Sequence, residues 1–123
     1  MVRTCLLIAS FSGWLVVGYS SGSWAQTSDY LVRDLLAPCI EGDNDARDGS
    51  VLEMECEQFI AGVINLYVYM GIAKKNNVCL PEQNQEDEVR WAFMRWGHHH
   101  FDQRHILAVQ GLLETFKAYF KCE

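Results

Sequence analysis

The sequence predicts an all-α fold: a small four-helix up-down bundle-like domain, stapled by two disulfides, that follows a cleaved signal peptide. Three observations predict it. Apolar side chains recur at spacings of three and four residues through most of the chain, four of the five cysteines lie after residue 25, and the chain opens with a short basic and apolar stretch. Outside Tyr67–Tyr69, which lies within a longer helical period, no alternating strand pattern exceeds four residues.

The first 25 residues have the composition of an export signal. An apolar run at 5–17 follows a basic start and gives way to small polar residues. Signal peptidase prefers small residues at the third and first positions before the peptide bond that it cleaves. We therefore expect cleavage between Ala25 and Gln26. The alternative is an uncleaved membrane anchor. It needs roughly 20 consecutive apolar residues, whereas Ser10, Ser12 and Gly13 interrupt this run. We therefore expect a signal peptide at 1–25, one domain at 26–123, and a periplasmic location.

The cysteines of the exported part are even in number, which is typical of a disulfide framework in an oxidising compartment. Four buried free thiols are the alternative. If the four helices alternate in direction, Cys39 and Cys56 fall at one end of the domain, and Cys79 and Cys122 at the other. Among the three possible pairings, this topology favours Cys39–Cys56 and Cys79–Cys122.

Helices are expected at about 28–38, 51–73, 85–96 and from 102 onward. Pro38 should end the first helix, because proline disfavours helical geometry in the residue before it. An acidic loop, 41–50, then precedes the second helix. The second half of this helix is apolar almost all round, so we expect it to be the central, most buried helix. Gly62 within it predicts a close crossing by another helix.

The third helix is expected to begin after Asn84 as its cap and to end at Gly97. Its apolar stripe is Val89, Phe93 and Trp96. In the fourth helix the stripe should consist of several large apolar residues, namely Ile106, Val109, Leu113, Phe116 and Phe120, widened by Leu112 and Tyr119.

The chain is acidic, which narrows the class of partner. Its net charge is −6, and loss of Arg3 with the signal peptide makes it −7. A surface of this kind disfavours nucleic acid and anionic membranes, because both need Lys and Arg. It is compatible with a basic protein partner, since opposite charge speeds encounter. Solubility alone is the alternative explanation.

Four histidines lie within eight residues, at His98, His99, His100 and His105. Imidazoles bind zinc, nickel or copper. Three consecutive histidines cannot all face one ion from a regular helix, and the sequence contains neither His-x-x-Glu-His nor Cys-x-x-Cys. We expect an exposed loop between helices here, and no metal or other cofactor.

Nothing in the sequence predicts an enzyme. The cysteines are expected in disulfides, and neither Gly-x-Ser-x-Gly nor a glycine-rich phosphate loop is present. Acidic clusters at 53–57 and 86–88 could supply paired carboxylates for catalysis. At their spacings we expect them to spread over solvated helix faces or to favour a helix start. Trp91 and Tyr69 lie off the apolar stripes, and exposed aromatic side chains of this kind are typical anchors of protein interfaces.

The order of these segments resembles the Rap/Tai family of type VI secretion immunity proteins. The matching segments are Leu35-Leu36-Ala37-Pro38-Cys39, Cys56-Glu57-Gln58-Phe59-Ile60-Ala61-Gly62-Val63, Cys79-Leu80-Pro81, a helix with Val89, and Phe120-Lys121-Cys122. The resemblance covers nearly all of 26–123. The sequence departs from the family where His98-His99 replaces a frequent His-Pro step before the last helix.

The resemblance implies a small helical periplasmic protein that binds a protein effector, a peptidoglycan hydrolase often of the amidase class, and occludes its active site. It implies no catalysis, and it implies that two copies often form a homodimer. The alternative function, from another class, is a periplasmic stress or folding-support protein similar to acid chaperones, which binds many clients through exposed apolar surface.

If the chain binds an effector, loops held by disulfides are the favoured contact regions, because their order lowers the entropy cost of binding. The candidate partner-binding residues lie in three loop regions and are Asp43, Asp45, Asp48, Glu82, Gln83, Glu86, His98 and His99.

Overall fold

The computed structural model describes residues 29–123, so the expected signal peptide lies outside the described residues. The helices are α1 (Val32–Asn44), α2 (Gly49–Tyr69), α3 (Ile72–Lys75), α4 (Gln85–His99), the 3-10 helix η1 (Phe101–Gln103) and α5 (Ala108–Tyr119). Within the described residues β pairing is limited to two isolated bridges, so the all-α class is confirmed. None of the helices in this part of the chain combines the length and apolar character needed to cross a bilayer.

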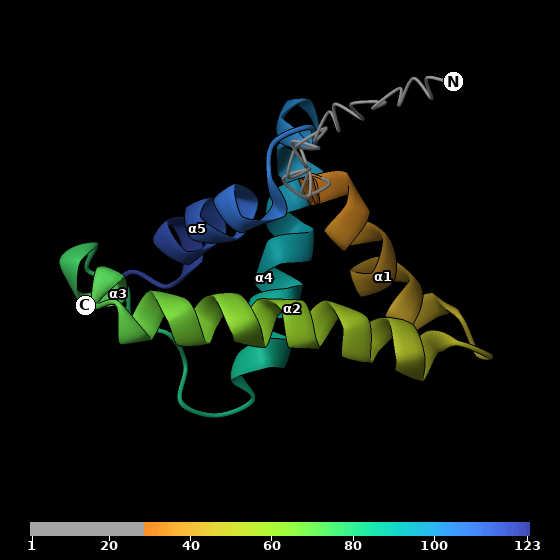
Figure 1. Ribbon diagram of the computed structural model, residues 1–123, viewed down its shortest axis with the longest axis horizontal. Coiled ribbons are helices and arrows are strands. Elements are labelled where there is room, and N and C mark those ends of the chain that lie inside the picture. The colour runs from red at the N-terminus through yellow and green to blue at the C-terminus, as the bar shows by residue number, and fades with distance from the viewer. Residues whose placement is uncertain (1–28) are drawn as a thin grey trace, which may run out of the picture.

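Helices α1 and α2 form a hairpin, and α4 crosses behind α2 (Figure 1). In that view α1 lies on one side of α4 and α5 on the other. The α1–α2 turn is at one end of the molecule, and α3 lies with the C-terminus at the other. Helix α4 contacts α1, α2 and α5, and in this view it lies between α1 and α5.

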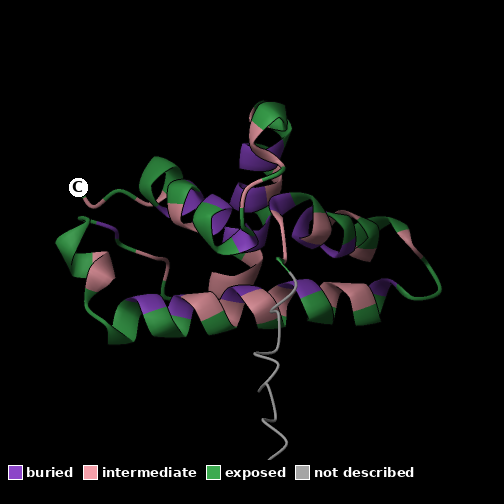
Figure 2. Ribbon diagram, turned by 45° about the horizontal axis from the view of Figure 1, so that its top comes forward, coloured by how far each residue is buried: buried purple, intermediate pink, exposed green. Residues whose placement is uncertain are grey.

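All four long helices contribute to the core, and α4 contributes an apolar stripe to it. Val89, Phe93 and Trp96 are at most 2% exposed, which confirms the predicted stripe of the third helix. They meet Leu35 of α1 and Phe116 of α5 in one buried cluster. The expectation that the second helix is the most buried is wrong. Figure 2 shows α2 with buried residues along one edge only, and exposed residues on the side that faces away from the other helices.

Helix α1 continues through Pro38 to Asn44, so the expected end at Pro38 is wrong. Proline cannot donate a hydrogen bond to the carbonyl four residues earlier. Here that carbonyl belongs to Asp34, and it accepts a hydrogen bond from the Tyr30 hydroxyl instead, at 3.3 Å. The acidic loop expected at 41–50 is consequently reduced to the turn Asp45–Asp48.

Helix α2 ends at Tyr69, four residues earlier than expected. Gly71 adopts a left-handed conformation with φ of 69°, which other residues rarely adopt, and α3 begins directly after it. Between α4 and α5, η1 and a short turn occupy residues 101–107, so α5 begins later than expected. Val109 on α5 is exposed and Leu113 is only partly buried, whereas Ala108, Leu112 and Phe116 are buried, so much of the buried stripe lies one residue before the expected one.

The close approaches between helices occur at glycines other than the expected one. A Cβ atom on Gly62 would meet nothing within 4 Å, so the predicted crossing there is wrong. A Cβ on Gly97 would lie 2.7 Å from Cδ1 of Leu36, and one on Gly111 would lie 2.5 Å from Cγ2 of Val32. Gly97 therefore lies inside α4 as the site where α1 packs closely, and does not end the helix.

Both predicted disulfides are confirmed. Cys39–Cys56 joins α1 to α2, and Cys79–Cys122 joins the segment after α3 to the C-terminus. The bonded cysteines are separated by 17 and 43 residues. Loop-closure entropy for such loops corresponds to about 3 and about 4 kcal/mol of stabilisation. Backbone hydrogen bonds from Cys79 to the Phe120 carbonyl (2.8 Å) and from Cys122 to the Asn77 carbonyl (3.0 Å) hold the second junction.

Candidate functional site

A buried arginine joins three helices at the end of the domain that carries the α1–α2 turn. The Arg90 side chain, in α4, is 4% exposed. Its Nη1 atom donates to Asp43 of α1 at 3.0 Å, and its Nη2 atom donates to Asp87 of α4 at 2.7 Å. Nη2 also lies 3.1 Å from Glu53 of α2, and Nε lies 3.8 Å from Glu57. We call these five residues the Arg90 cluster.

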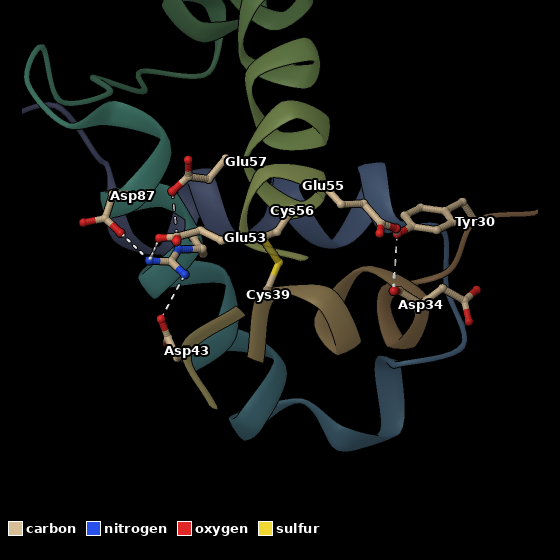
Figure 3. Close-up of a disulfide and its surroundings, with 10 residues drawn as sticks. Tyr30, Asp34, Cys39, Asp43, Glu53, Glu55, Cys56, Glu57 and Asp87 are labelled. Carbon is tan, nitrogen blue, oxygen red and sulfur yellow. Dashed lines mark hydrogen bonds and ion pairs between the residues drawn. A yellow bond between two sulfur atoms is a disulfide. The ribbon is translucent and has the colours of Figure 1, made fainter. Parts of the chain in front are cut away.

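The Arg90 cluster lies beside the Cys39–Cys56 disulfide (Figure 3). Figure 3 shows Asp43, Glu53, Glu57 and Asp87 turned toward one another from the ends of three helices. The disulfide fixes α1 to α2 next to Glu57 and one turn from Glu53, and the guanidinium fixes both helices to α4. The geometry of this surface is therefore set by one covalent link and one buried cation.

The cluster has more negative than positive charge. One guanidinium faces four carboxylates, which remain between 28% and 47% exposed. Desolvation raises the pKa of Glu57, repulsion from Glu53 adds to the effect, and attraction to Arg90 opposes it. Burial acts to lower the pKa of Arg90, but the hydrogen bond to Asp87 and the charges of Asp43 and Glu53 outweigh it and raise that pKa. The exposed edges of the carboxylates thus offer an anionic surface to a cationic partner.

A metal ion is a poor occupant of this surface. Oxygen atoms of Glu53, Glu57 and Asp87 lie within 4.8 Å of one another, the usual spacing of ligands around an ion. Arg90 already contacts all three, and its positive charge would repel a metal ion at the same point. Nε of Arg90 is buried without a hydrogen-bond acceptor, so this atom requires an acceptor and not a second cation.

Sequence reasoning missed the convergence of these residues. It placed the acidic clusters on separate solvated faces, and this expectation is wrong for Glu53, Glu57 and Asp87. Two signals were present: an acidic pair four residues apart on α2, and a single arginine, Arg90, directly after an apolar core position, Val89. Only the packing of α4 against α2 brings the two signals together.

The predicted contact residues near the α1–α2 turn have three different environments. Asp43 belongs to the Arg90 cluster. Asp45 accepts hydrogen bonds from the backbone N–H groups of Asp48 and Arg47, and these bonds lower its pKa. Asp45 therefore holds the turn, whereas the Asp48 side chain at the start of α2 is exposed and caps no backbone group.

The predicted contact residues of α4 lie at its two ends. Glu82 and Gln83 are exposed in the loop before α4, and Glu86 in its first turn adds to the repulsion that raises the pKa of Glu57. His98 and His99 are exposed in the last turn, about 18 Å along the helix from Glu86. The structure therefore brings Asp43, Glu86 and their neighbours together and places the two histidines apart from them.

Among the described residues, no three of the four histidines bring their ring nitrogens close enough together to hold one metal ion. The rings of His98 and His99 meet edge to face at 5.5 Å between centroids. His100 instead stacks on Trp96 at 4.7 Å, with its Nδ1 atom 2.8 Å from the Trp96 carbonyl oxygen. His100 is thereby directed onto its own helix, away from its neighbours.

Trp91 lies beside the Arg90 cluster, and its exposure confirms the prediction from the sequence. This residue is 47% exposed, and the guanidinium carbon of Arg90 lies 5.5 Å from its ring centroid. One turn further along α4, Arg95 lies over the ring of Tyr119. A hollow of about 190 Å³ lies between them, lined by Glu88, Trp91, Ala92, Arg95, Tyr119 and Phe120. Trp, Tyr and Arg are the residues most enriched at energetically important interface positions.

These features define a small, disulfide-stapled helical binding domain with an anionic surface next to exposed aromatic side chains. The chain belongs to the Rap1a immunity protein family: the family model matches residues 31–122, about three quarters of the sequence. The match confirms the resemblance, and a family of immunity proteins implies binding of an effector and a non-enzymatic role. Comparisons with curated proteins and with solved structures give no match.

Proposed function

We propose that the protein is exported to the periplasm and there binds and occludes a peptidoglycan hydrolase, of the amidase class, delivered as a type VI effector. Membership of an immunity protein family supports the protective role. The two disulfides support export, because such bonds persist in oxidising compartments. In this proposal residues 1–25 are the signal peptide and 26–123 the exported domain.

The observation that carries the proposed mode of binding is the Arg90 cluster. Its carboxylates outnumber its single cation, they stay partly exposed, and Trp91 lies beside them. An effector with a basic rim around its active site would gain from this charge, since complementary charge speeds association and suppresses wrong partners. Trp91 would supply the apolar anchor at the centre of such an interface.

The residues around the cluster divide into those that hold the surface and those that would meet the partner. Asp43 and Asp45 are engaged within the domain, through Arg90 and through the turn. Asp48 and Glu82 are exposed, and neither side chain has an ion-pair partner among the described residues. We therefore propose Asp48 and Glu82 as direct contacts, with Gln83, Glu86, His98 and His99 as further contacts.

The test begins with the oxidised protein recovered from the periplasm of a bacterium that expresses the full chain. It serves as bait for proteins from native periplasm and from effector-producing competitors, followed by mass spectrometry. The captured protein is then assayed for peptidoglycan hydrolysis with and without the bait. We expect one partner and complete inhibition at a 1:1 ratio. Capture without inhibition, or inhibition of no hydrolase, would contradict the proposal.

The contact surface is tested by charge reversal with a matched control. Asp48→Lys combined with Glu82→Lys should slow association at least about tenfold, because it replaces attraction by repulsion. The control is Glu114→Lys combined with Glu123→Lys, which changes net charge equally at exposed positions on α5 and at the C-terminus. Equal association rates for the two variants would remove this surface from the interface.

A second candidate function is the binding of many partly unfolded clients in the periplasm. The observation that favours it is the exposed apolar face of α2, where Leu66, Tyr69 and Met70 are each more than half exposed. Selectivity distinguishes the two: a folding-support protein would retain many weakly held clients, and would bind them more strongly at low pH as carboxylates and histidines protonate.

We also propose that the protein forms a homodimer. The exposed apolar face of α2 supports this proposal, because contiguous exposed apolar patches are typical of protein interfaces.

A further inference from the structure

The second half of α2 presents an uncharged face in a strongly acidic protein. No Asp, Glu, Lys or Arg occurs from Gln58 to Ala73, whereas the chain as a whole has a net charge of −6. On this stretch Leu66 and Tyr69 are exposed. Figure 2 shows exposed residues along the side of α2 that faces away from the other helices. No part of the described structure covers this face.

A hollow lies on the same face, at Gly62. A Cβ atom on Gly62 would have no neighbour within 4 Å, and the missing side chain leaves a depression between α2 and α5. Its volume is about 400 Å³, and it is lined by Gln58, Phe59, Gly62, Val63, Leu66 and Val109. The hollow is therefore apolar and large enough to receive an aromatic side chain.

A matching projection stands two helical turns further along. Tyr69 is 89% exposed, the largest exposed fraction of any large apolar side chain in the described residues. Seven residues of an α-helix span about 10 Å and return to nearly the same face, so Tyr69 and the Gly62 hollow are neighbours on one surface. A projection and a hollow at a fixed spacing on one helix are self-complementary under a two-fold axis midway between them.

We propose that two copies of this chain pack through their α2 helices, antiparallel, about a two-fold axis at Asn65 and Leu66. In this arrangement Tyr69 of each copy enters the Gly62 hollow of the other. The inference rests on the proposed self-association and adds its surface and register. It needs no effector and no change of fold.

Charge favours a second copy over a basic effector as the occupant. Two copies repel each other wherever their carboxylates meet, and the uncharged face is where this repulsion is least. The two ends of the face also carry opposite charge: Glu53 and Glu55 precede it, and Lys74 and Lys75 follow it. Antiparallel packing brings the acidic end of one copy toward the basic end of the other, whereas a basic partner would meet no carboxylate on the face itself.

The experiment measures the mass in solution of the oxidised, periplasmically expressed protein by sedimentation velocity over 1 to 100 µM, about the range in which modest dimers dissociate. The test variants are Gly62→Lys, which fills the hollow with a charge, and Tyr69→Ala, which removes the projection. The control is Trp91→Ala, which removes another large, exposed aromatic side chain from a different surface. Circular dichroism checks that each variant keeps its helical content.

We expect the wild type and Trp91→Ala to be dimers, and the other two variants to dissociate at least about tenfold more readily. Asn65→Cys, next to the axis, should form a covalent dimer on mild oxidation, whereas Trp91→Cys should not. A wild type that is monomeric at 100 µM would overturn both the self-association and this surface. A dimer that persists in Gly62→Lys and Tyr69→Ala would overturn the surface alone. Loss of effector capture by these variants from a monomeric wild type would assign the face to the effector. None of these outcomes alters the inhibition assay that tests the immunity role.

Discussion

The two halves of helix α2 lie in one continuous helix but have opposite surface chemistry. The first half carries Glu53 and Glu57, which turn to the buried guanidinium of Arg90, and Cys56, which is bonded to α1. The second half carries no charge and leaves Leu66 and Tyr69 exposed. One helix therefore presents two surfaces of different chemistry: an acidic one, which we propose meets a basic partner, and a neutral one, which we propose meets a second copy.

The two halves differ because they make different contacts within the domain. The carboxylates of the first half are held by a buried cation, so that end of the helix is fixed to α1 and α4. The second half contacts α5 along one edge only. Beyond that edge Gly62 and Val109 line a hollow, which a larger residue than glycine on α2 would have helped to fill. Substitutions in each half, and at the residues that hold it, should therefore have different effects on stability.

The largest effect is expected from Arg90→Met, which keeps the buried apolar stem and removes the charge. Four carboxylates from three helices would then face one another without their cation. Removal of one partner from a buried ion pair costs about 3–5 kcal/mol, and the partial exposure of these carboxylates favours the lower end, near about 3 kcal/mol. Urea unfolding of the oxidised protein measures the loss.

Arg95→Met is the matched control for Arg90→Met. Arg95 is an exposed arginine one turn further along the same helix, and its removal should cost less than about 1 kcal/mol. Equal losses for the two variants would mean that the Arg90 cluster does not hold the three helices together.

Gly→Ala substitutions at two positions should change stability by an intermediate amount, and with opposite signs. Gly97→Ala places a Cβ atom 2.7 Å from Leu36 and should cost about 1–3 kcal/mol through overpacking. Gly62→Ala meets no neighbour within one copy and, at a protein concentration at which the chain is monomeric, should stabilise the helix by up to about 1 kcal/mol. Thermal unfolding of the two variants at the same protein concentration compares them. A loss at Gly62 as large as that at Gly97 would show that the face of α2 is covered in solution.

The smallest effect is expected from Glu57→Gln. Because the pKa of Glu57 is raised in the folded protein, the folded state binds a proton more readily than the unfolded state, and the ionised carboxylate lowers stability above that pKa. The variant should therefore be more stable than the wild type at pH 7, by less than about 1 kcal/mol, given the partial exposure of the side chain. The advantage should disappear as the pH falls through the raised pKa.

Unfolding as a function of pH measures this difference, with Glu123→Gln as a control that removes an equal charge at the exposed C-terminus. A variant less stable than the wild type at pH 7 would mean that attraction to Arg90 outweighs desolvation and the repulsion from Glu53.

The sequence by itself determined the helical class, both disulfides and the family. These features depend on local periodicity and on the order of cysteines along an alternating chain, and both can be read from residue spacing. The buried stripe of Val89, Phe93 and Trp96 and the exposed Trp91 followed from the same 3.6-residue period.

The contacts between residues distant in sequence depend on how the helices pack, and residue spacing did not predict them. Pro38 stays inside a helix because Tyr30 donates to the carbonyl that proline leaves without a partner. Gly97, and not Gly62, is where a helix approaches closely, because the angle at which α4 crosses α1 sets that distance. The Arg90 cluster combines carboxylates from α1, α2 and α4. Helical periodicity fixes which face of each helix is apolar. The packing of the helices sets the angles at which they cross, and these angles bring distant charged residues onto one surface.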